Sequence, residues 1–281
     1  MPELPEVETA CGLLRDALVG RKISAVEAIE DQIVFCGQST DHIENAFLGN
    51  QVKSIRRKGK YFGWEMDNGA VIAGHLGMTG AILDLTPGAE RAVHYRETRK
   101  DPPLGERPRF LKLWLETKDG RIVAFVDGRR LARIWVTAAF DSDTRISALG
   151  PDAYEALPDP SAFHARVTKR KAPIKAILLD QSFLAGIGNY LADEVLYQSG
   201  IAPSRIGASL SIQESNVLRE QIETVVGHAV RVEANHEQFP STWLFHARWG
   251  GKSGRAEFNG HVLVREKIGG RTTAWSPDRQ K

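Results

Sequence analysis

The first seven residues, with the sequence Met-Pro-Glu-Leu-Pro-Glu-Val, carry groups that could perform covalent chemistry. Removal of Met1, which is usual before a proline, would leave Pro2 as a secondary α-amine close to the carboxylates of Glu3 and Glu6. Because α-amino groups titrate near about 7.7–8.0, an appreciable fraction of such amines is unprotonated at neutral pH. Attack on a sugar C1′ would give an iminium ion, the electron sink that covalent amine catalysis exploits. Many chains begin with Met-Pro by chance, so the pattern needs support from the rest of the sequence.

A second candidate site is the segment Gly186-Ile187-Gly188-Asn189, which lies between two helical patterns. Its glycines let the backbone approach a partner closely, and Asn189 stands where the following helix starts. The N–H groups and the positive end of the helix dipole at such a place favour an anion. A tight helix–helix turn is the commonest alternative meaning of a Gly-x-Gly sequence in this position.

Basic residues gather in three parts of the chain although the net charge is only +2. Residues 53–60 and 166–175 each hold five Lys or Arg and no acid, and from Ser241 onward eight Lys or Arg face three acids. Local basic patches on a near-neutral chain are what contact with phosphates requires. Each patch, taken singly, is explained equally well as a surface that keeps the protein soluble.

The elements that would position these groups differ between the two halves of the chain. An amphipathic helix is predicted from Val7 to Leu18, with Pro5 in its first turn, where the missing N–H costs nothing. Strand-like runs then follow in quick succession, which indicates an antiparallel sandwich or barrel. These runs are 61–66, 70–76, 110–116, 121–126 and 131–136, with turns at 67–69 and 118–120 and a long polar excursion at 86–109.

The C-terminal half reads as helical beyond an acidic, proline-containing linker. Helices are predicted at about 161–168, 173–181, 190–199 and 209–230, and the stretch 231–253 has no regular pattern. Residues 256–275 fit a β-hairpin that turns at Gly269-Gly270.

Composition limits the class of protein. The chain has 281 residues, of which 42% are hydrophobic and 26% charged, as in a globular protein with one large domain or two ordinary ones. It has no run of 18 apolar residues and no basic-then-apolar start, so neither a membrane span nor a secretory signal is expected. Its only cysteines, Cys11 and Cys36, exclude a disulfide framework and a four-cysteine zinc site. We expect an intracellular protein, nuclear if the source is eukaryotic and otherwise in the cytoplasm or nucleoid.

Four motifs occur in the order found in one known family, and the similarity runs from residue 2 to about 275. They are Pro-Glu-Leu-Pro-Glu-Val-Glu at 2–8, Arg-Arg-Lys-Gly-Lys-Tyr at 56–61, His-Leu-Gly-Met-Thr-Gly at 75–80, and the turn at 186–189. The chain resembles formamidopyrimidine-DNA glycosylases and their endonuclease VIII relatives. The resemblance implies an α+β protein with an N-terminal antiparallel β-sandwich that carries an N-terminal helix, and a C-terminal helix-two-turn-helix domain with a β-hairpin finger. The implied boundaries are 1–137 for the β-sandwich, 138–160 for the linker, 161–247 for the helix-two-turn-helix domain and 248–281 for the finger.

The resemblance also implies roles for catalytic residues. Pro2 is similar to the family's catalytic amine, and Glu3 to its acid/base partner. Glu6 matches a further acidic position, although a role in starting the helix suits it equally well. Lys60 resembles the hairpin lysine that reaches into the site and to a phosphate, whereas its neighbours at 56–58 are interpreted as surface charge.

Further residues resemble those that hold DNA. His75 and Asn189 correspond to residues that bind the backbone phosphate of the lesion nucleotide, with a buried core histidine as the alternative for His75. Lys175 matches a lysine near the phosphates, and Arg271 matches the arginine at the tip of the finger. Tyr190 is interpreted as a packing residue.

Reaching the damaged base requires extruding its nucleotide, which costs roughly a few kcal/mol in stacking and pairing. By position, Met78, Arg129 and Leu131 would fill the resulting gap, with Arg129 on the orphaned base and Leu131 as a wedge. Burial in the core of a strand is the alternative for Leu131.

The chain departs from the family pattern in three places. Without further cysteines the zinc finger of the best-known members cannot form, so the chain resembles the zincless branch, and no metal or small cofactor is expected. Trp249, Phe258 and Trp275 are the predicted core of the finger. Leu131 replaces the phenylalanine usual in bacterial enzymes, and residues 231–247 are unlike the loop that covers 8-oxoguanine there.

The predicted function is that of a DNA-formamidopyrimidine glycosylase with AP lyase activity, acting in base excision repair. Formamidopyrimidines and hydantoin-type lesions are the expected substrates, and 8-oxoguanine is a further candidate. The expected partner is damaged double-stranded DNA in the cleft between the domains; no membrane is involved, and the protein is expected to be a monomer. Two alternatives stay open: an endonuclease VIII-like enzyme for oxidised pyrimidines, and a non-catalytic damage-binding protein if Met1 is retained.

Overall fold

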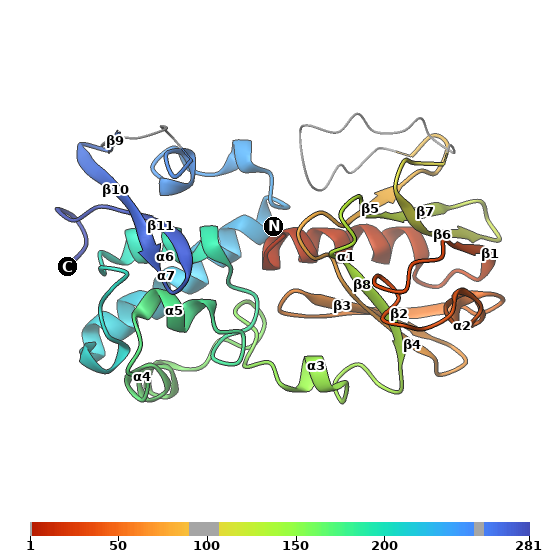
Figure 1. Ribbon diagram of the computed structural model, residues 1–281, viewed down its shortest axis with the longest axis horizontal. Coiled ribbons are helices and arrows are strands. Elements are labelled where there is room, and N and C mark those ends of the chain that lie inside the picture. Colours follow the sequence, from red (N-terminus) through yellow and green to blue (C-terminus); the bar gives the residue numbers. More distant parts are fainter. Residues whose placement is uncertain (1, 90–106, 250–255) are drawn as a thin grey trace. The chain divides into compact units, whose positions relative to one another are not determined.

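The computed structural model describes residues 2–89, 107–249 and 256–281, and it divides into two compact units, Met1–Ala148 and Leu149–Lys281 (Figure 1). The first unit is built mainly of antiparallel strands and the second mainly of helices. The predicted α+β class is therefore confirmed. Among the described residues, no helix is both long enough and apolar enough to cross a membrane.

Two four-stranded antiparallel sheets form the first unit. One sheet has the strand order β2-β3-β4-β8, with bounds Val52–Lys58, Tyr61–Met66, Val71–His75 and Arg133–Thr137. The other has the order β1-β6-β7-β5, with bounds Ile23–Ala28, Leu111–Thr117, Ile122–Val126 and Ala81–Asp84. Two short helices, α2 (Thr40–Phe47) and α3 (Thr144–Ser147), accompany them.

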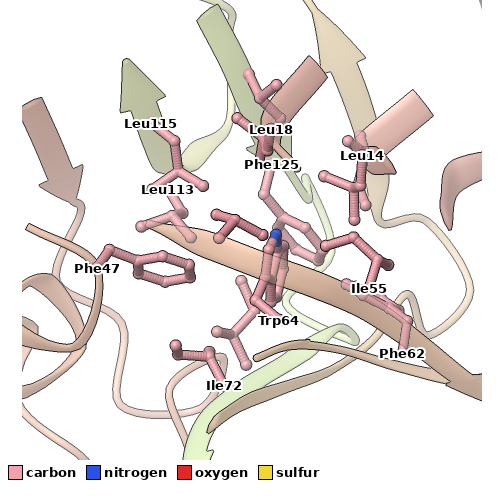
Figure 2. Close-up of a cluster of buried hydrophobic side chains, with 14 of the residues drawn as sticks. Leu14, Leu18, Phe47, Ile55, Phe62, Trp64, Ile72, Leu113, Leu115 and Phe125 are labelled. Carbon is pink, nitrogen blue, oxygen red and sulfur yellow. The ribbon is translucent and has the colours of Figure 1, made fainter. Parts of the chain in front are cut away.

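Helix α1 (Leu4–Leu18) packs its apolar side into the core that both sheets share (Figure 2). Leu14 and Leu18 from the helix lie against aromatic residues such as Trp64 and Phe125, which come from different sheets. Burying a side chain of this size contributes roughly 1.5–3 kcal/mol. This packing holds the N-terminal end of the chain on the sandwich.

The elements of this unit were only partly predicted. The five expected strands form within two residues of the expected bounds, but α1 begins three residues earlier, at Leu4. Strands β1, β2 and β5 and helix α2 were missed, because these short segments are rich in charged or small residues and lack a clear apolar period. Most of the excursion at 86–109 lies outside the described residues.

The described residues of the second unit form four α-helices and a three-stranded sheet of order β11-β10-β9. The helices are α4 (Pro160–Thr168), α5 (Ile174–Leu179), α6 (Asn189–Ser199) and α7 (Ile212–Arg231), and the strands are β9 (Ala256–Phe258), β10 (His261–Ile268) and β11 (Arg271–Trp275). The stretch expected to be irregular contains two short 3₁₀ helices, His236–Gln238 and Leu244–His246. Strands β10 and β11 join through Gly269-Gly270, whose positive φ values of 62° and 76° suit a two-residue hairpin turn.

The predicted core of the finger is wrong in one of its three residues. Trp249 is 73% exposed, with the guanidinium of Arg248 stacked 4.2 Å from its ring. Phe258 packs against the core, and the half-buried Trp275 donates its Nε1–H to Glu266. The fully buried residues at the base of the sheet are instead Tyr197 of α6, Leu244, Leu263 and Ala274.

Candidate functional site

The N-terminal end of α1 fixes the backbone beside Pro2. Glu3 is the N-cap residue, and its N–H donates to Oε2 of Glu6 at 3.0 Å while the Glu3 carboxylate accepts the N–H of Glu6. Pro2, Glu3 and Glu6 are all buried. This reciprocal capping box gives Glu6 the helix-start role considered from the sequence, and it holds the Glu6 carboxylate on the backbone N–H of the residue that follows Pro2.

Lys60 lies on the two-residue turn Gly59-Lys60 between β2 and β3, and a neighbouring arginine secures this turn. The side chain of Arg57 is fully buried, forms an ion pair with Glu8 of α1, and donates to the carbonyl of Gly59 at 3.1 Å. The interpretation of Arg57 as surface charge is therefore wrong. It connects the helix that carries Pro2 and Glu3 to the turn that carries Lys60.

His75, at the end of β4, is held as a neutral imidazole. The N–H of Gly77 donates to its Nδ1 at 2.9 Å, so the other ring nitrogen, Nε2, carries the proton. Burial, reinforced by the positive charges of Lys60 and Arg133, lowers the pKa of His75 to about 4. Tyr61, which directly follows Lys60, pairs with His75 across β3 and β4, so Lys60 and His75 lie near one another.

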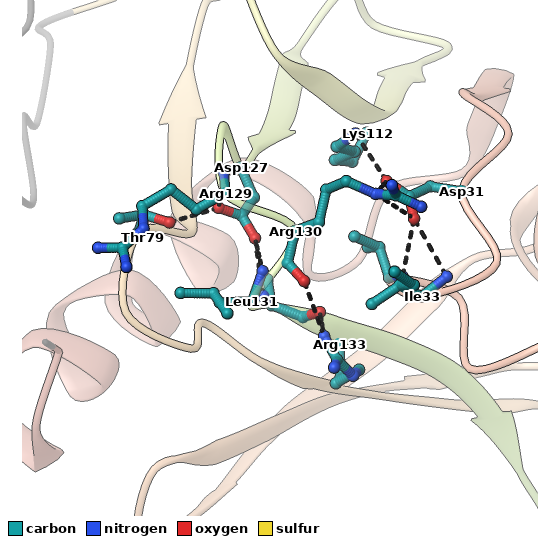
Figure 3. Close-up of polar contacts among 11 residues, drawn as sticks. Asp31, Ile33, Thr79, Lys112, Asp127, Arg129, Arg130, Leu131 and Arg133 are labelled. Atoms are coloured by element: carbon teal, nitrogen blue, oxygen red, sulfur yellow. Dashed lines mark hydrogen bonds and ion pairs between the residues drawn. The ribbon is translucent and has the colours of Figure 1, made fainter.

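Asp127 organises the loop at 127–132, which carries Arg129 and Leu131 (Figure 3). Its buried carboxylate accepts the hydroxyl of Thr79 at 2.6 Å. It also accepts three backbone N–H groups, from Arg129, Leu131 and Ala132, at 3.1, 2.7 and 2.7 Å. These hydrogen bonds keep the pKa of Asp127 below its usual value despite the opposing effect of burial. One carboxylate therefore sets the shape of this loop and attaches it to the loop at 76–80.

The loops at 76–80 and 127–132 are in direct contact. Gly77 has φ of +61°, and a Cβ at this position would lie 2.3 Å from the carbonyl oxygen of Leu131, so only glycine fits. Met78 is 40% exposed, Arg129 is exposed and Leu131 is half-buried. The three residues predicted to fill the gap in DNA therefore stand on two adjoining loops.

Arg130 points away from its neighbours in this loop. It has a left-handed backbone, with φ of +56°, and its Nε donates to both carboxylate oxygens of Asp31 at 2.9 and 3.2 Å (Figure 3). Asp31 is buried, also binds Lys112, and accepts the N–H groups of Ile33 and Val34. These bonds hold the pKa of Asp31 far below its usual value although burial opposes the shift. Asp31 thus binds the middle of the loop through Arg130, in addition to the backbone hydrogen bonds that Asp127 accepts from the same loop.

In the second unit, Asn189 is the first residue of α6, and its side chain donates to the carbonyl oxygen of Thr272 at 3.0 Å. Thr272 follows Arg271, which is exposed at the start of β11. The helix N-terminus and the hairpin arginine are therefore joined by a direct hydrogen bond. Asn189 and Arg271, two of the three residues of this unit that were predicted near phosphates, therefore belong to one local structure.

Lys175, which matches a lysine near the phosphates by resemblance, is buried beside the Asn189 turn. Its side chain is fully buried and its ammonium binds the carboxylate of Asp193 and the carbonyl of Asn189. Arg248 binds the second carboxylate oxygen of Asp193 and also approaches the Asn189 carbonyl. A lysine enclosed in this way cannot reach a phosphate without leaving its ion pair, so we assign it a role in positioning the Asn189 turn.

Beside this group, Glu194 is buried at the centre of α6. It accepts hydrogen bonds from Gln198 and from the N–H of Phe245, but burial is the larger effect and raises its pKa to about 7. Tyr190, buried as expected, packs among Phe239, Phe245 and the ring of His236. The segment 231–247 is thus attached to α6 by a hydrogen-bonded carboxyl group and by aromatic packing.

The fold and these residues define a two-unit α+β protein with a β-sandwich, a helix-two-turn-helix region and a cysteine-free β-hairpin. Family models agree: the formamidopyrimidine-DNA glycosylase N-terminal domain matches residues 1–134, and the H2TH domain of the same family matches residues 149–241. The chain belongs to the formamidopyrimidine-DNA glycosylase family, as the four motifs had indicated.

Curated relatives and solved structures extend this result. A formamidopyrimidine-DNA glycosylase of Arabidopsis thaliana is 39% identical over 282 residues, covering 100% of this chain and 71% of the relative, and one of Acidiphilium cryptum is 32% identical over 232 residues, covering 82% and 77%. A structure of MutM in complex with DNA that contains carbocyclic 8-oxo-G has a TM-score of 0.79 at 25% identity, with full coverage of both chains. Lactococcus lactis Fpg, in complex with DNA that contains an abasic site, has a TM-score of 0.79 at 23% identity and 99% coverage of each chain.

Proposed function

We propose that this protein is a bifunctional DNA glycosylase and AP lyase that removes oxidised purines from duplex DNA in base excision repair. The observation that carries the proposal is the capping box at α1, which holds the Pro2–Glu3 segment in one backbone conformation beside a second carboxylate, Glu6. Formamidopyrimidines and hydantoin-type lesions are the proposed substrates, and 8-oxoguanine is a further one to be tested.

The chemistry assigned to this segment proceeds through covalent attachment of the sugar to Pro2. After removal of Met1, the Pro2 nitrogen attacks C1′, and the bond from C1′ to the base breaks as the base leaves with a proton. Opening of the sugar ring, with a proton delivered to O4′ from Glu3, then gives an iminium ion between Pro2 and C1′. Glu3 next removes a proton from C2′, the 3′ phosphate leaves, and a second elimination releases the 5′ phosphate. Water then hydrolyses the iminium, which breaks the bond between Pro2 and C1′ and frees the amine.

We assign DNA binding to residues in each of the two units. In the first unit, Lys60 and the Nε2–H of His75 supply a cation and a neutral donor for phosphate oxygens. In the second unit, Arg271 and the N-terminus of α6 at Asn189 supply a cation and a helix dipole. Met78, Arg129 and Leu131 would fill the space left by the extruded nucleotide. Binding of DNA by this chain is supported by its likeness to the Lactococcus lactis Fpg and MutM proteins, whose structures are complexes with DNA.

Borohydride trapping on a duplex with one abasic site tests the proposal. A covalent adduct whose mass analysis places DNA on the Pro2 terminus is expected, together with its loss in the Pro2→Gly variant. An adduct on a lysine, or an undiminished adduct in Pro2→Gly, would contradict the Pro2 mechanism. Protein of confirmed mass without Met1 that gives no adduct would favour a damage-binding protein. A panel of duplexes with oxidised purines and pyrimidines then separates the proposed substrates from those of an endonuclease VIII-like enzyme.

A further inference from the structure

One end of the sheet β1-β6-β7-β5 brings four chain segments together. Pairing of Leu111 with Val126, and of Val126 with Ala81, puts the start of β6, the end of β7 and the start of β5 side by side. The end of β1 joins them, because Ala28 pairs with Leu113. The loop at 127–132 therefore leaves the sheet between the segment before β5 and the segment before β6.

Exposed apolar side chains are concentrated at this sheet end. Among the described residues of the first unit, five large hydrophobic side chains are exposed, and four of them lie here: Ile29, Ile33, Met78 and Phe110. The fifth, Leu48, follows α2 elsewhere in the unit. Isolated exposed apolar residues are ordinary, but their concentration around one loop indicates a surface that binds a partner.

Phe110 stands out within this group because of its backbone. Its φ of +67° lies in the left-handed region, which is costly for a bulky aromatic residue. The strand pairing is irregular between Leu111 and Leu113, directly after it, and bulges of this kind redirect side chains next to functional sites. The carbonyl of Phe110 accepts the N–H of Asp127 at 3.0 Å, so the residue adjoins the start of the 127–132 loop.

The charge around Phe110 favours nucleic acid over an apolar protein partner. The guanidinium of Arg109 lies 4.5 Å from the centre of its ring, and Arg129 is exposed on the adjoining loop. The two buried acids of this region, Asp31 and Asp127, are both occupied by hydrogen bonds within the protein. An exposed aromatic ring beside an arginine, hydrogen-bonded through its backbone to the start of the loop that carries Leu131, is suited to stack on a base that has lost its neighbour.

We propose that Phe110 is an additional DNA-contacting residue, which stacks on a base next to the extruded nucleotide while Arg109 binds the adjacent phosphate. This assignment rests on the proposed function, because it requires the loop at 127–132 to face the damaged site. Phe110 would thus supply an aromatic contact next to the extruded nucleotide, whereas Leu131 supplies only an aliphatic side chain there.

The experiment compares variants in binding a duplex that contains a tetrahydrofuran abasic-site analogue, with 2-aminopurine as the neighbouring base. Phe110→Gly removes the ring and also relieves the left-handed backbone, so the variant should fold at least as well as the natural chain. We expect its affinity for this duplex to fall about fivefold or more and the change in 2-aminopurine fluorescence to shrink, with little change for undamaged duplex. Phe110→Trp should keep both signals, and Phe110→Leu should lose most of the fluorescence change. Leu48→Ala is the control with a similarly exposed apolar residue and should behave as the natural chain.

Two results would overturn the proposal: Phe110→Gly binding the abasic duplex as Leu48→Ala does, or an equal loss on damaged and undamaged duplexes. Failure of the proposed function gives a different result. In that case the natural chain itself would show no preference for the abasic duplex and no borohydride adduct, whatever residue stands at position 110.

Discussion

Asp193 and Lys175 form an ion pair in which neither side chain is exposed to solvent. The second oxygen of the same carboxylate binds Arg248 and lies 3.4 Å from the N–H of Ala274 in β11. Lys175 lies on α5 and Asp193 on α6, so this group connects two helices to the finger. In a chain whose two cysteines exclude a four-cysteine zinc site, a buried ionic group and a small apolar core hold the hairpin that carries Arg271.

Replacing Asp193 by Asn should therefore destabilise the second unit strongly. The change leaves Lys175 and Arg248 as buried cations without their counter-ion, and removal of one partner of a buried pair costs about 3–5 kcal/mol. Urea unfolding should show this loss in the free energy of unfolding. The matched control is Glu223→Gln, which breaks the exposed pair between Glu223 and Arg219 and should cost less than about 1 kcal/mol. Equal effects of the two substitutions would contradict a structural role for the buried group.

Arg57 should affect catalysis more than DNA binding. The guanidinium of Arg57 donates both to Glu8 of α1 and to the Gly59 carbonyl. Arg57→Lys keeps the positive charge, but the lysine ammonium does not reproduce these two hydrogen bonds together. We expect single-turnover cleavage of abasic DNA to slow about tenfold or more, since small misplacements at a reacting centre are costly. The dissociation constant for the same duplex should change much less. Arg56→Lys, at an exposed arginine paired with Asp141, is the control and should change neither quantity. A loss of affinity without slower cleavage would show that Arg57 serves binding instead.

Much of the fold could be predicted from local sequence patterns. The helix at α1 and the five strands found in advance have clear apolar periods and are bounded by turn residues. Strand β2 was missed because its inward positions include an arginine, Arg57, whose burial depends on Glu8 from another element. The sequence of β2 alone does not show that Arg57 has an acidic partner on α1.

The residues of the candidate site, too, could be predicted only in part from the sequence. Pro2, Glu3, Lys60 and His75 lie in short motifs and could be named from the sequence, although their roles stay proposals. The acids that position the loops and turns could not be named, because each also binds a residue from another element: Asp31 binds Arg130, Asp127 binds Thr79 and Asp193 binds Lys175. The match of Lys175 to a lysine near the phosphates stays a prediction, and its ion pair with Asp193 could not be predicted, because only the fold brings the two residues together.

His75 should contribute to DNA affinity without adding to its salt dependence. Its pKa of about 4 means that it meets a phosphate as a neutral donor from pH 5.5 to 8, so no counterion release is attached to it. Lys60→Ala should reduce the slope of log K against log salt concentration by about 0.9, whereas His75→Ala should weaken binding and leave the slope unchanged. Binding titrations from 50 to 300 mM salt measure both quantities. A slope reduced by His75→Ala would mean that the imidazole becomes protonated on DNA.

Asp127 should control how well the protein distinguishes damaged from intact DNA. In Asp127→Asn the amide group replaces an oxygen that accepts N–H groups, so at least one donor of the loop loses its acceptor and faces another donor. We expect a stability loss of about 2–3 kcal/mol and a fall of tenfold or more in the affinity ratio between abasic-analogue and undamaged duplexes. Thr79→Ala removes only one hydrogen bond to the same carboxylate and should give a clearly smaller change. An unchanged ratio in Asp127→Asn would show that the loop does not need this carboxylate.

Glu194 should make the second unit less stable as the pH rises from about 4.5 to 7. Burial raises its pKa to about 7, so across this range the folded state binds more protons than the unfolded state, and the free energy of unfolding falls with increasing pH. Above pH 7 the full cost of a buried charge is present, on the order of 3 kcal/mol for a shift of this size. Glu194→Gln can still accept the Phe245 N–H and pair with a reoriented Gln198 amide, so it should remove this dependence and be more stable than the natural chain at pH 8. Urea unfolding of both proteins at pH 5, 6, 7 and 8 isolates the contribution of Glu194, because all other titrating groups are shared. Parallel stability curves for the two proteins would show that Glu194 is ionised in the folded state throughout this range.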